Sequence, residues 1–530
     1  MTVQTETADV VIAGAGPTGL MLAIELRLGG VTPVVLERLP AISEIPKGNG
    51  LFGMIVPVLD YRGLLEPLRA EATFAGPVPR FFFGPLTLDF AGLSPSPLQV
   101  LAAPQRTIER KLAERLAELG GTVRRDHELT GLSREGDAIT IDVRGPAGGY
   151  RVHSRYLAGC DGAHSQVRKL AGIDFPGVTT DTVARIGRVR VPADLIVAGT
   201  GELDVPGAGR LRIMQPVRTP GGTYSIGPQA SVDKASPRDV YIVSTHEEQP
   251  GTDLTAPMTL DELADSVRRV IGAGLPMSDP IWLTRLGSNS RQADRYRDGP
   301  ILLAGDAAHV IGVGGSLNAA LLDALNLGWK LAAGVRGSAP EGLLDSYHAE
   351  RHAAGQRALL QSRAQRVLSR GDVYAQAARD LVGELLQFPD PARHLGELIA
   401  GSDVRYDMSG PGRPSAPAGL VHPLTGRLAP DLRVRASDRT TRVAELLRAA
   451  RPVLLDFTAG GRVAGAAAER DELVTIVVGT PLAGSPPADA LLIRPDGYVA
   501  WATGPRAADP ADGLATAMRT WCARAAASAT

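Results

Sequence analysis

A glycine pattern near the start of the chain has the spacing of a loop that binds a dinucleotide. Gly14, Gly16 and Gly19 follow a short β-branched run and precede a segment with helical spacing of apolar residues. In such a loop the first glycine allows a tight turn, the second lets the backbone approach a pyrophosphate, and the third lets helix and strand pack closely. Glu37 follows a second apolar run, 32–36, where a carboxylate can accept hydrogen bonds from ribose hydroxyls. The pattern predicts a dinucleotide-binding βαβ unit; the alternative is an ordinary glycine turn beside a surface glutamate.

Two later segments place an aspartate beside a glycine after an apolar run. The first contains Asp161 within residues 160–168, and the second spans 305–309, followed by Leu317 and Asn318. With the glycine loop, these motifs in this order resemble the class A flavin-dependent monooxygenases, the superfamily of para-hydroxybenzoate hydroxylase. The resemblance is strongest to the three-domain branch with phenol hydroxylase, rifampicin monooxygenase and aromatic polyketide hydroxylases, and it covers nearly the whole chain.

The resemblance and the texture of the chain together imply an α/β protein with three domains. We expect a discontinuous, Rossmann-like FAD-binding domain of the GR2 type over 1–175 and 284–400. An inserted sheet-rich substrate domain is expected over 176–283, where short strand-like runs alternate with Gly/Pro turns. Residues 415–530 resemble the thioredoxin-like third domain of the family, after a Gly/Pro-rich linker at 409–414.

The resemblance also implies which residues hold FAD. The glycine loop with Glu37 and Arg38 would hold the ADP half, Lys47 would face the pyrophosphate, and Gln105 would lie along the sugar chain. Asp306 would bond the ribityl hydroxyls, and the backbone near Leu317 would cradle the isoalloxazine. Asp161 belongs to a signature associated with FAD and the nicotinamide donor, although alone it would indicate only a turn. The expected cofactor residues are Gly14, Gly16, Pro17, Thr18, Gly19, Glu37, Arg38, Lys47, Gln105, Asp161, Asp306, Gly315, Ser316, Leu317 and Asn318.

In the family, NAD(P)H reduces the flavin, oxygen adds at its C4a carbon, and the hydroperoxide hydroxylates a ring or inserts oxygen beside a ketone. The cofactor carries the difficult step while the protein positions substrate and excludes water. The resemblance therefore implies a monooxygenase, driven by NADPH or NADH, that tailors a polyketide or polycyclic natural product. No catalytic side chain is assigned, because His309 within a packed motif is more often structural. The expected substrate-lining residues are Arg212, Met214, Tyr224, Ile311 and Val313.

The loop at 310–316 departs from the family pattern. It is two residues shorter than the usual form and lacks both of its prolines. Because this loop lies beside the flavin in the family, the change either reshapes the pocket wall or is a harmless variant. The alternative function is a redox-neutral, FAD-bound cyclase, such as a [4+2] decalin-forming enzyme, and an aromatic content of only 4% suits an aliphatic substrate. A non-catalytic FAD-binding protein would give no reason to keep Asp161 and Asp306 together.

Composition limits the other classes of function. The 530 residues carry 56 Lys and Arg against 57 Asp and Glu, so a nucleic-acid or membrane-surface partner is not expected. The two cysteines, Cys160 and Cys522, form no CxxC pair, and the nine histidines show no metal spacing. The first apolar run is broken by glycines and lacks a basic flank, so we expect a cytoplasmic protein. The expected partner is a small natural-product molecule, and a homodimer is possible.

The elements that must position these residues follow from periodicity. Residues 104–119 read as a helix that begins at a proline and ends at Gly120 and Gly121. Residues 138–143 and 150–157 read as a hairpin leading to Asp161. The other expected elements are helices at 261–271, 318–335 and 442–448 and strands at 452–457, 473–478, 490–494 and 498–501, while 51–61 is ambiguous.

Overall fold

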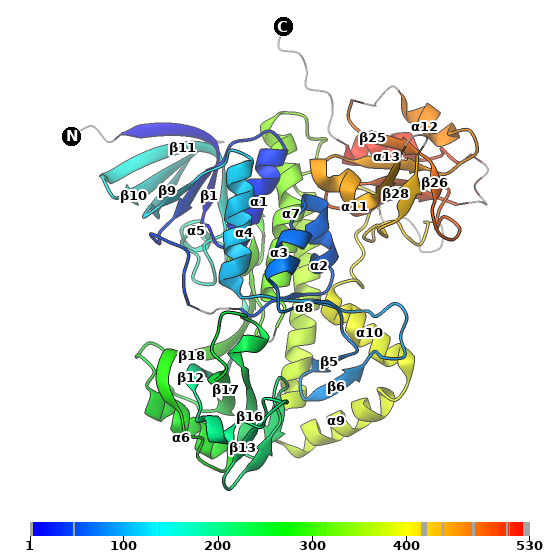
Figure 1. Cartoon of the computed structure of the whole chain (residues 1–530). Coiled ribbons are helices and arrows are strands. Elements are labelled where there is room, and N and C mark those ends of the chain that lie inside the picture. Colours follow the sequence, from blue (N-terminus) through cyan, green and yellow to red (C-terminus); the bar gives the residue numbers. More distant parts are fainter. Residues whose placement is uncertain are drawn as a thin grey trace.

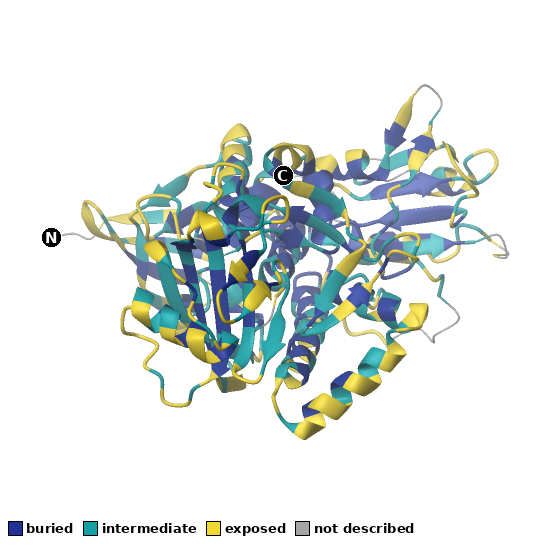
Figure 2. Ribbon diagram, turned by 60° about the horizontal axis from the view of Figure 1, so that its bottom comes forward, coloured by how far each residue is buried: buried dark blue, intermediate teal, exposed yellow. Residues whose placement is uncertain are grey.

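The computed structural model describes residues 4–45, 48–136, 138–312, 314–414, 421–436, 439–468, 472–504, 507 and 509–522. The three largest sheets of the described residues stand apart in space and are joined by helices (Figure 1). The N-terminal sheet lies at the upper left, the middle sheet at the lower left and the C-terminal sheet at the upper right. The long helix α8 (Ser346–Ser369) runs between the upper and lower parts. Strands and central helices are largely buried, while exposed residues gather on loops and outer helix faces (Figure 2).

The N-terminal sheet confirms the predicted βαβ unit. Strand β1 (Thr5–Ala13) pairs in parallel with β2 (Val34–Glu37), and α1 (Pro17–Leu28) connects them. Over the described residues, the strand order is β19-β20-β11-β1-β2-β8, with β10 paired to β11 and β9 to β10. Helix α1 packs against α7 (Ser316–Val335) and α4 (Gln105–Glu118). The other strands are β8 (Val123–Arg125), β9 (Glu128–Glu135), β10 (Ala138–Gly145), β11 (Gly148–Gly159), β19 (Arg297–Asp298) and β20 (Ile301–Leu303).

The predicted helix at 104–119 and the hairpin at 138–157 are confirmed as α4 and as antiparallel β10 and β11. The ambiguous segment 51–61 forms a short strand followed by helical turns. Residues 74–102 contain small strands that periodicity did not predict. The elements here are β3 (Leu51–Phe52), α2 (Ile55–Val58), α3 (Leu65–Glu71), β4 (Phe74–Pro77), β5 (Arg80–Phe83), β6 (Leu86–Asp89) and β7 (Gln99–Ala102).

The middle sheet is antiparallel, in the order β15-β16-β17-β12-β18-β21 over the described residues. Helix α6 (Leu260–Ile271) covers one face, and α8 lies beside β18. Strand β18 (Ser278–Gln292) pairs with β12 on both sides of residue 283, so the expected domain boundary falls inside one strand. The other strands of this sheet are β12 (Gly177–Arg190), β15 (Val217–Thr219), β16 (Gly222–Pro228), β17 (Val240–Glu248) and β21 (His309–Val310), while β13 (Leu203–Val205) and β14 (Gly209–Leu211) pair with each other in a separate sheet.

The C-terminal sheet has the order β25-β24-β27-β28, and its strands confirm the four strand segments predicted there. Its core includes Trp329 of α7 and Trp521 of α13 (Leu514–Trp521), so it packs on the central helices. No described helix combines the length and apolar character needed to cross a bilayer. The remaining elements are α5 (Gln166–Leu170), α9 (Val373–Leu385), α10 (Pro389–Ala400), β22 (Arg433–Arg435), β23 (Thr440–Arg442), α11 (Val443–Leu446), β24 (Val453–Asp456), α12 (Arg462–Ala467), β25 (Thr475–Val478), β26 (Thr480–Pro481), β27 (Ala490–Ile493) and β28 (Val499–Thr503).

Candidate functional site

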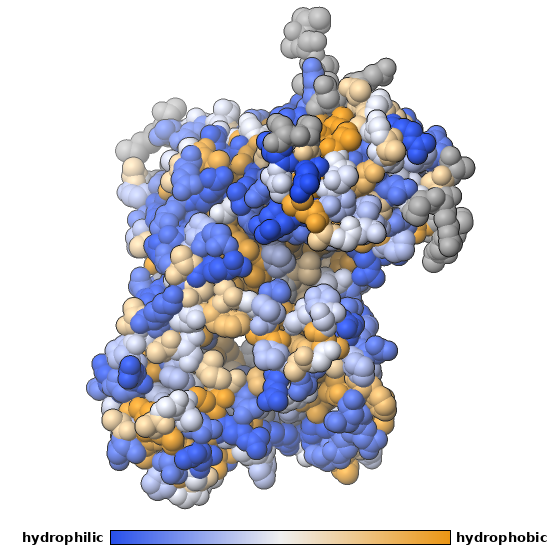
Figure 3. All heavy atoms as spheres, turned by 45° about the vertical axis from the view of Figure 1, so that its right-hand side comes forward, coloured by the Kyte–Doolittle hydropathy of each residue, from blue (hydrophilic) through white to orange (hydrophobic). Residues whose placement is uncertain are grey.

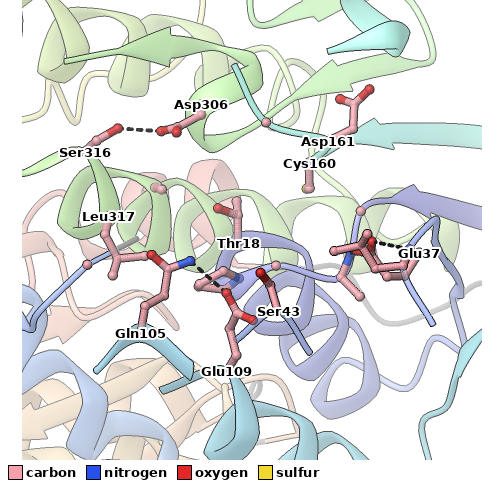
Figure 4. A pocket seen from close by; sticks show the side chains of 18 of the residues that line it. Thr18, Glu37, Ser43, Gln105, Glu109, Cys160, Asp161, Asp306, Ser316 and Leu317 are labelled. Atoms are coloured by element: carbon pink, nitrogen blue, oxygen red, sulfur yellow. Dashed lines mark hydrogen bonds between the residues drawn. The ribbon is translucent and has the colours of Figure 1, made fainter. Parts of the chain in front are cut away.

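A cavity of about 710 Å³ opens where β1 and β11 end and α1 and α7 begin. Glu37 lies toward one end, and Asp306 with Ser316 lies toward the other (Figure 4). Gly19 lies outside its lining, and Lys47 and Val313 lie outside the described residues. The cavity brings together Gly14, Gly16, Pro17, Thr18, Glu37, Arg38, Gln105, Asp161, Asp306, Ile311, Gly315, Ser316, Leu317 and Asn318 from the expected set.

The three loop glycines have different neighbours. A Cβ on Gly19 would lie 1.9 Å from the carbonyl oxygen of Gly14, and one on Gly14 would lie 2.4 Å from the carbonyl oxygen of Cys160. Gly14 also has a φ of +99°, a backbone conformation that residues other than glycine rarely adopt. A Cβ on Gly16 would meet nothing within 4 Å. The first and third glycines are thus required by the protein itself, whereas the second faces open space at the start of α1.

Glu37 joins the glycine loop to the end of β2. Its Oε2 accepts a hydrogen bond from the Ala15 amide at 2.8 Å, and its Oε1 accepts one from the Leu39 amide at 2.9 Å. A carboxylate has further lone pairs, so both oxygens can still accept from a hydroxyl in the cavity. Arg125 is the parallel partner of Glu37 on β8 and lines the same end, as does His127. Sequence reasoning missed these two; the signal available was that the strand after α4 is the next neighbour of β2.

Asp161 and Gln105 are already engaged by the protein. The Asp161 carboxylate accepts hydrogen bonds from Ser165 Oγ at 2.5 Å and from the Gln166 amide at 2.6 Å, so it caps the first turn of α5. Gln105 donates from Nε2 to Glu109 Oε1 at 2.7 Å. Glu109, one turn further along α4, is a lining residue that the sequence did not single out. Asp161 therefore shapes its turn whatever else it contacts.

A buried aspartate holds the second Gly-Asp motif in place. Asp323 accepts hydrogen bonds from the Gly305 amide at 3.0 Å, His309 Nε2 at 2.6 Å and Arg351 Nε at 2.7 Å. Burial alone would raise the pKa of Asp323, but the charges of His309 and Arg351 bring it below its ordinary value. His309 is fully buried and does not line the cavity. Its position therefore supports the structural interpretation, with Asp306 presented to the cavity from the turn that Asp323 fixes.

The substrate-lining residues expected on the middle sheet do not line this cavity. Tyr224 is buried in the cluster between the sheet and α6. Met214 lies over Gly227, whose cross-strand partner is Ile242, and is half-exposed. Arg212 is exposed, and its contact with substrate stays a prediction.

The face of the middle sheet opposite α6 carries polar side chains among apolar ones such as Ile186 and Ile242. Thr245 and Glu247 of β17 bond to Ser266 on α6, so the alternating residues Ser244 and His246 point to the other face. There the His246 ring contacts Ser244 Oγ at 3.1 Å. Burial, followed by the positive charge of Arg366, lowers the pKa of His246 to about 4. The imidazole is therefore neutral at physiological pH.

Two domain models match the chain, an FAD binding domain over residues 7–362 and the C-terminal domain of aromatic-ring hydroxylases over 422–525. The chain belongs to the FAD-dependent aromatic-ring hydroxylases. It is 40% identical over 525 residues to the 12-dehydrotetracycline 5-monooxygenase/anhydrotetracycline 6-monooxygenase of Streptomyces rimosus, covering 97% of this chain and 98% of that one. The solved structure of OxyS anhydrotetracycline hydroxylase from S. rimosus has a TM-score of 0.84 at 38% identity, covering 97% of this chain and 99% of that one. The dialkyldecalin synthase of Streptomyces rugosporus is 36% identical over 521 residues, covering 97% and 98%.

This hydroxylase is an FAD-dependent monooxygenase, as the resemblance predicts. The residues around the cavity fit the cofactor, because the space in front of Gly16 and the N-terminus of α1 together form a cradle for a pyrophosphate. Among the described residues, no three of His, Cys, Asp and Glu are grouped to hold a metal ion.

Replacing Asp306 by alanine should lower the affinity of this hydroxylase for FAD by about tenfold or more, because a carboxylate that can accept from cofactor hydroxyls is lost. Asp306 also accepts from Ser316 Oγ, so Ser316→Ala separates the loss of this internal bond from the loss of the carboxylate. Titration of apoprotein with FAD, followed by quenching of flavin fluorescence, measures the affinity. Full flavin occupancy in Asp306→Ala at stoichiometric FAD would show that the Asp306 carboxylate does not bond the hydroxyls of the cofactor.

The neutral state of His246 predicts a pH dependence of stability. With a pKa of 6.5 in the unfolded chain and about 4 in the folded one, the unfolded chain binds the proton first as pH falls. The contribution of buried, neutral His246 to the free energy of unfolding is therefore fully present above about pH 6.5 and is lost as pH falls towards 4. The loss is roughly 3 kcal/mol at most. His246→Gln should flatten this decline in urea-unfolding curves, whereas the same change at exposed His394 should leave it unchanged. Equal slopes for wild type and His246→Gln would contradict the assignment.

Proposed function

We propose that this hydroxylase uses NAD(P)H and oxygen to hydroxylate, or to insert oxygen into, a polycyclic polyketide. The observation that carries the proposal is the contact between the cofactor cavity and the middle sheet. Gly312, in the loop beside Ile311 and Gly315, packs against Ser288 and Ser290 of β18. A substrate on that sheet would thus lie next to the end of the cavity that Asn318 and Phe52 line. The names of the S. rimosus relatives support a tetracycline-like substrate.

The three sheets support an assignment of parts. In this proposal the N-terminal sheet with α1, α4 and α7 is the Rossmann-like FAD domain, and the middle sheet is the substrate domain. The continuity of β18 favours placing the domain boundary after Gln292 rather than at residue 283. The C-terminal sheet is assigned as the thioredoxin-like domain, and both of the chain's cysteines are buried, which favours a packing role. Bound FAD supplies the activation of oxygen, while Asp306, Glu37 and the glycine loop hold and orient it.

A redox-neutral cyclase is the second candidate, and two observations favour it. One is the shortened loop at 310–316, and the other is the similarity to the dialkyldecalin synthase of S. rugosporus. The similarity to the S. rimosus sequence named an anhydrotetracycline monooxygenase and to the solved structure of an anhydrotetracycline hydroxylase weighs towards the monooxygenase.

Anaerobic mixing of the holoenzyme with NADPH, with and without anhydrotetracycline, separates the two functions. We expect the probe to accelerate the loss of flavin absorbance, and admission of oxygen to give a product heavier by one oxygen atom. Conversion of the probe without NADPH and without bleaching would support a cyclase. Identical bleaching rates with and without the probe, and no oxygenated product, would contradict the proposed substrate class.

A further inference from the structure

Arg366 on α8 is a partly buried guanidinium without a carboxylate partner. Burial lowers its pKa below its ordinary value. Among the described residues, its hydrogen bond is to Ser288 Oγ, and no carboxylate oxygen lies within 4.0 Å of it. The more deeply buried Arg62, Arg351 and Arg494 are all paired with carboxylates. A guanidinium has five N–H donors, so most of the hydrogen-bonding capacity of Arg366 is unused.

The position of Arg366 links the middle sheet to the loop at the end of the cofactor cavity. Ser288, its partner, has its Oγ 3.1 Å from where a Cβ on Gly312 would lie. Earlier on α8, the Nε2 atom of Gln361 lies 3.9 Å from the corresponding point on Gly315. Arg366 is therefore separated from the cavity loop by a single serine side chain.

The neighbours of Arg366 leave its charge uncompensated. On β17, the neutral His246 and Ser244 point to the same side of the sheet, and the charge of Arg366 contributes to keeping His246 neutral. Glu248 ends that strand and is exposed; its charge acts on Arg366 only at a distance. On β12, Arg188 is the cross-strand partner of Ile242 and therefore lies on the same face of the sheet as Ser244 and His246. Arg188 lies 3.9 Å from Asp233, and Glu248 carries a negative charge at the end of this face, so it is Arg366 itself that favours an anion here.

We propose that Arg366 anchors the substrate through an ionised phenol or enol oxygen. Ser244 and the neutral His246 supply uncharged hydrogen-bonding partners beside it. Nη2 of Arg366 is already engaged by Ser288, so the free donors fit one oxyanion better than the two oxygens of a bidentate carboxylate. The inference rests on the proposed function for the identity of the bound molecule as substrate, and it adds that the substrate carries an acidic hydroxyl at the end that meets α8. Figure 3 shows a waist between the upper and lower parts of the molecule, with apolar and polar side chains beside one another on its surface.

Binding of two small probes to the holoenzyme tests this without turnover. The probes are 2-naphthol, whose absorbance changes on ionisation, and 2-methoxynaphthalene, which has no acidic proton. We expect the wild type to bind 2-naphthol at least about tenfold more tightly than the ether and to show the naphtholate band at neutral pH. Arg366→Gln should lose both the band and the preference, Arg366→Lys should retain part of each, and Arg363→Gln, an exposed change on the same helix, should match the wild type.

The result that would overturn the proposal is an Arg366→Gln variant that keeps the naphtholate band. A wild type that binds both probes equally, or neither, would also overturn it. The outcome of this binding experiment does not depend on oxygen transfer, because no reductant is present. A protein that ionises bound 2-naphthol but never consumes NADPH would refute the proposed monooxygenation and would leave the proposed role of Arg366 intact.

Discussion

Replacing Gly19 by alanine is expected to lower the free energy of unfolding by about 3 kcal/mol or more and to abolish FAD binding. The added Cβ would lie 1.9 Å from the carbonyl oxygen of Gly14, and because the nearest atom is backbone, no rotation of a side chain can relieve the clash. Helix α1 would have to shift away from β1, whose Val10, Val11 and Ile12 are fully buried. Urea unfolding of the apoprotein measures the change, and FAD titration measures the accompanying loss of binding.

Gly16→Ala is the matched control, because its Cβ meets nothing in the protein and its φ of −70° suits any residue. The apoprotein should unfold within about 0.5 kcal/mol of the wild type. Its FAD affinity should nevertheless fall by roughly tenfold to a hundredfold, since the methyl group occupies space that a pyrophosphate needs beside the amides of α1. If Gly16→Ala bound FAD as tightly as the wild type, the pyrophosphate would not lie in front of this residue.

The contrast between these glycines shows what spacing alone could predict. The order of strand, glycine loop and helix depends on neighbours within about 20 residues, so the three glycines and Glu37 could be placed from sequence. Tyr224 could not be, because whether a strand residue faces α6 or α8 depends on which side the helix covers. The pairing of Tyr224 with Thr245, which bonds to α6, fixes the face in the structure.

Longer-range features of the site were also beyond the sequence. Asp323 lies 18 residues after Gly305 on a segment that the sequence places in a helix, but the pattern does not predict that its carboxylate holds that turn and His309. Arg366 lies in an Arg- and Gln-rich helix segment in which nothing marks the residue that faces the sheet. Both assignments needed the packing of α7 and α8 against the two sheets, which no local pattern encodes.

Glu350→Gln is expected to lower the free energy of unfolding by about 3–5 kcal/mol, because it leaves the buried ammonium of Lys330 without its carboxylate partner and leaves Arg494 with Asp496 alone. Glu350 accepts hydrogen bonds from Arg494 at 2.7 and 2.8 Å, from Lys330 at 2.8 Å and from Asn326 at 2.6 Å. Burial alone would raise the pKa of Glu350, but Arg494 and Lys330 lower it to about 2. Burial lowers the pKa of Lys330 to about 8. The charge of Glu350 opposes this shift and is the main influence that keeps the ammonium protonated.

Glu350 and Arg494 lie where the central helices pack against the C-terminal sheet. Arg494 lies on the turn after β27, between the rings of Trp329 at 5.3 Å and Trp521 at 4.7 Å. Tryptophan fluorescence should therefore report the loss directly during urea unfolding. Glu118→Gln, which removes the exposed partner of Arg115, is the control and should cost less than about 0.5 kcal/mol.

The dependence of stability on pH tests whether Glu350 acts through its charge. The folded pKa of Glu350 lies below its ordinary value of 4.5, so its contribution is present above about pH 4.5 and is lost as pH falls towards 2. The stability gap between wild type and Glu350→Gln should accordingly be full at neutral pH and should narrow below pH 4.5. Adding Lys330→Met to Glu350→Gln should restore part of the loss, because it removes the buried charge that has lost its carboxylate partner, whereas Arg494 still pairs with Asp496. A gap that is independent of pH, or a double variant no more stable than the single one, would mean that Glu350 acts through packing rather than through its charge.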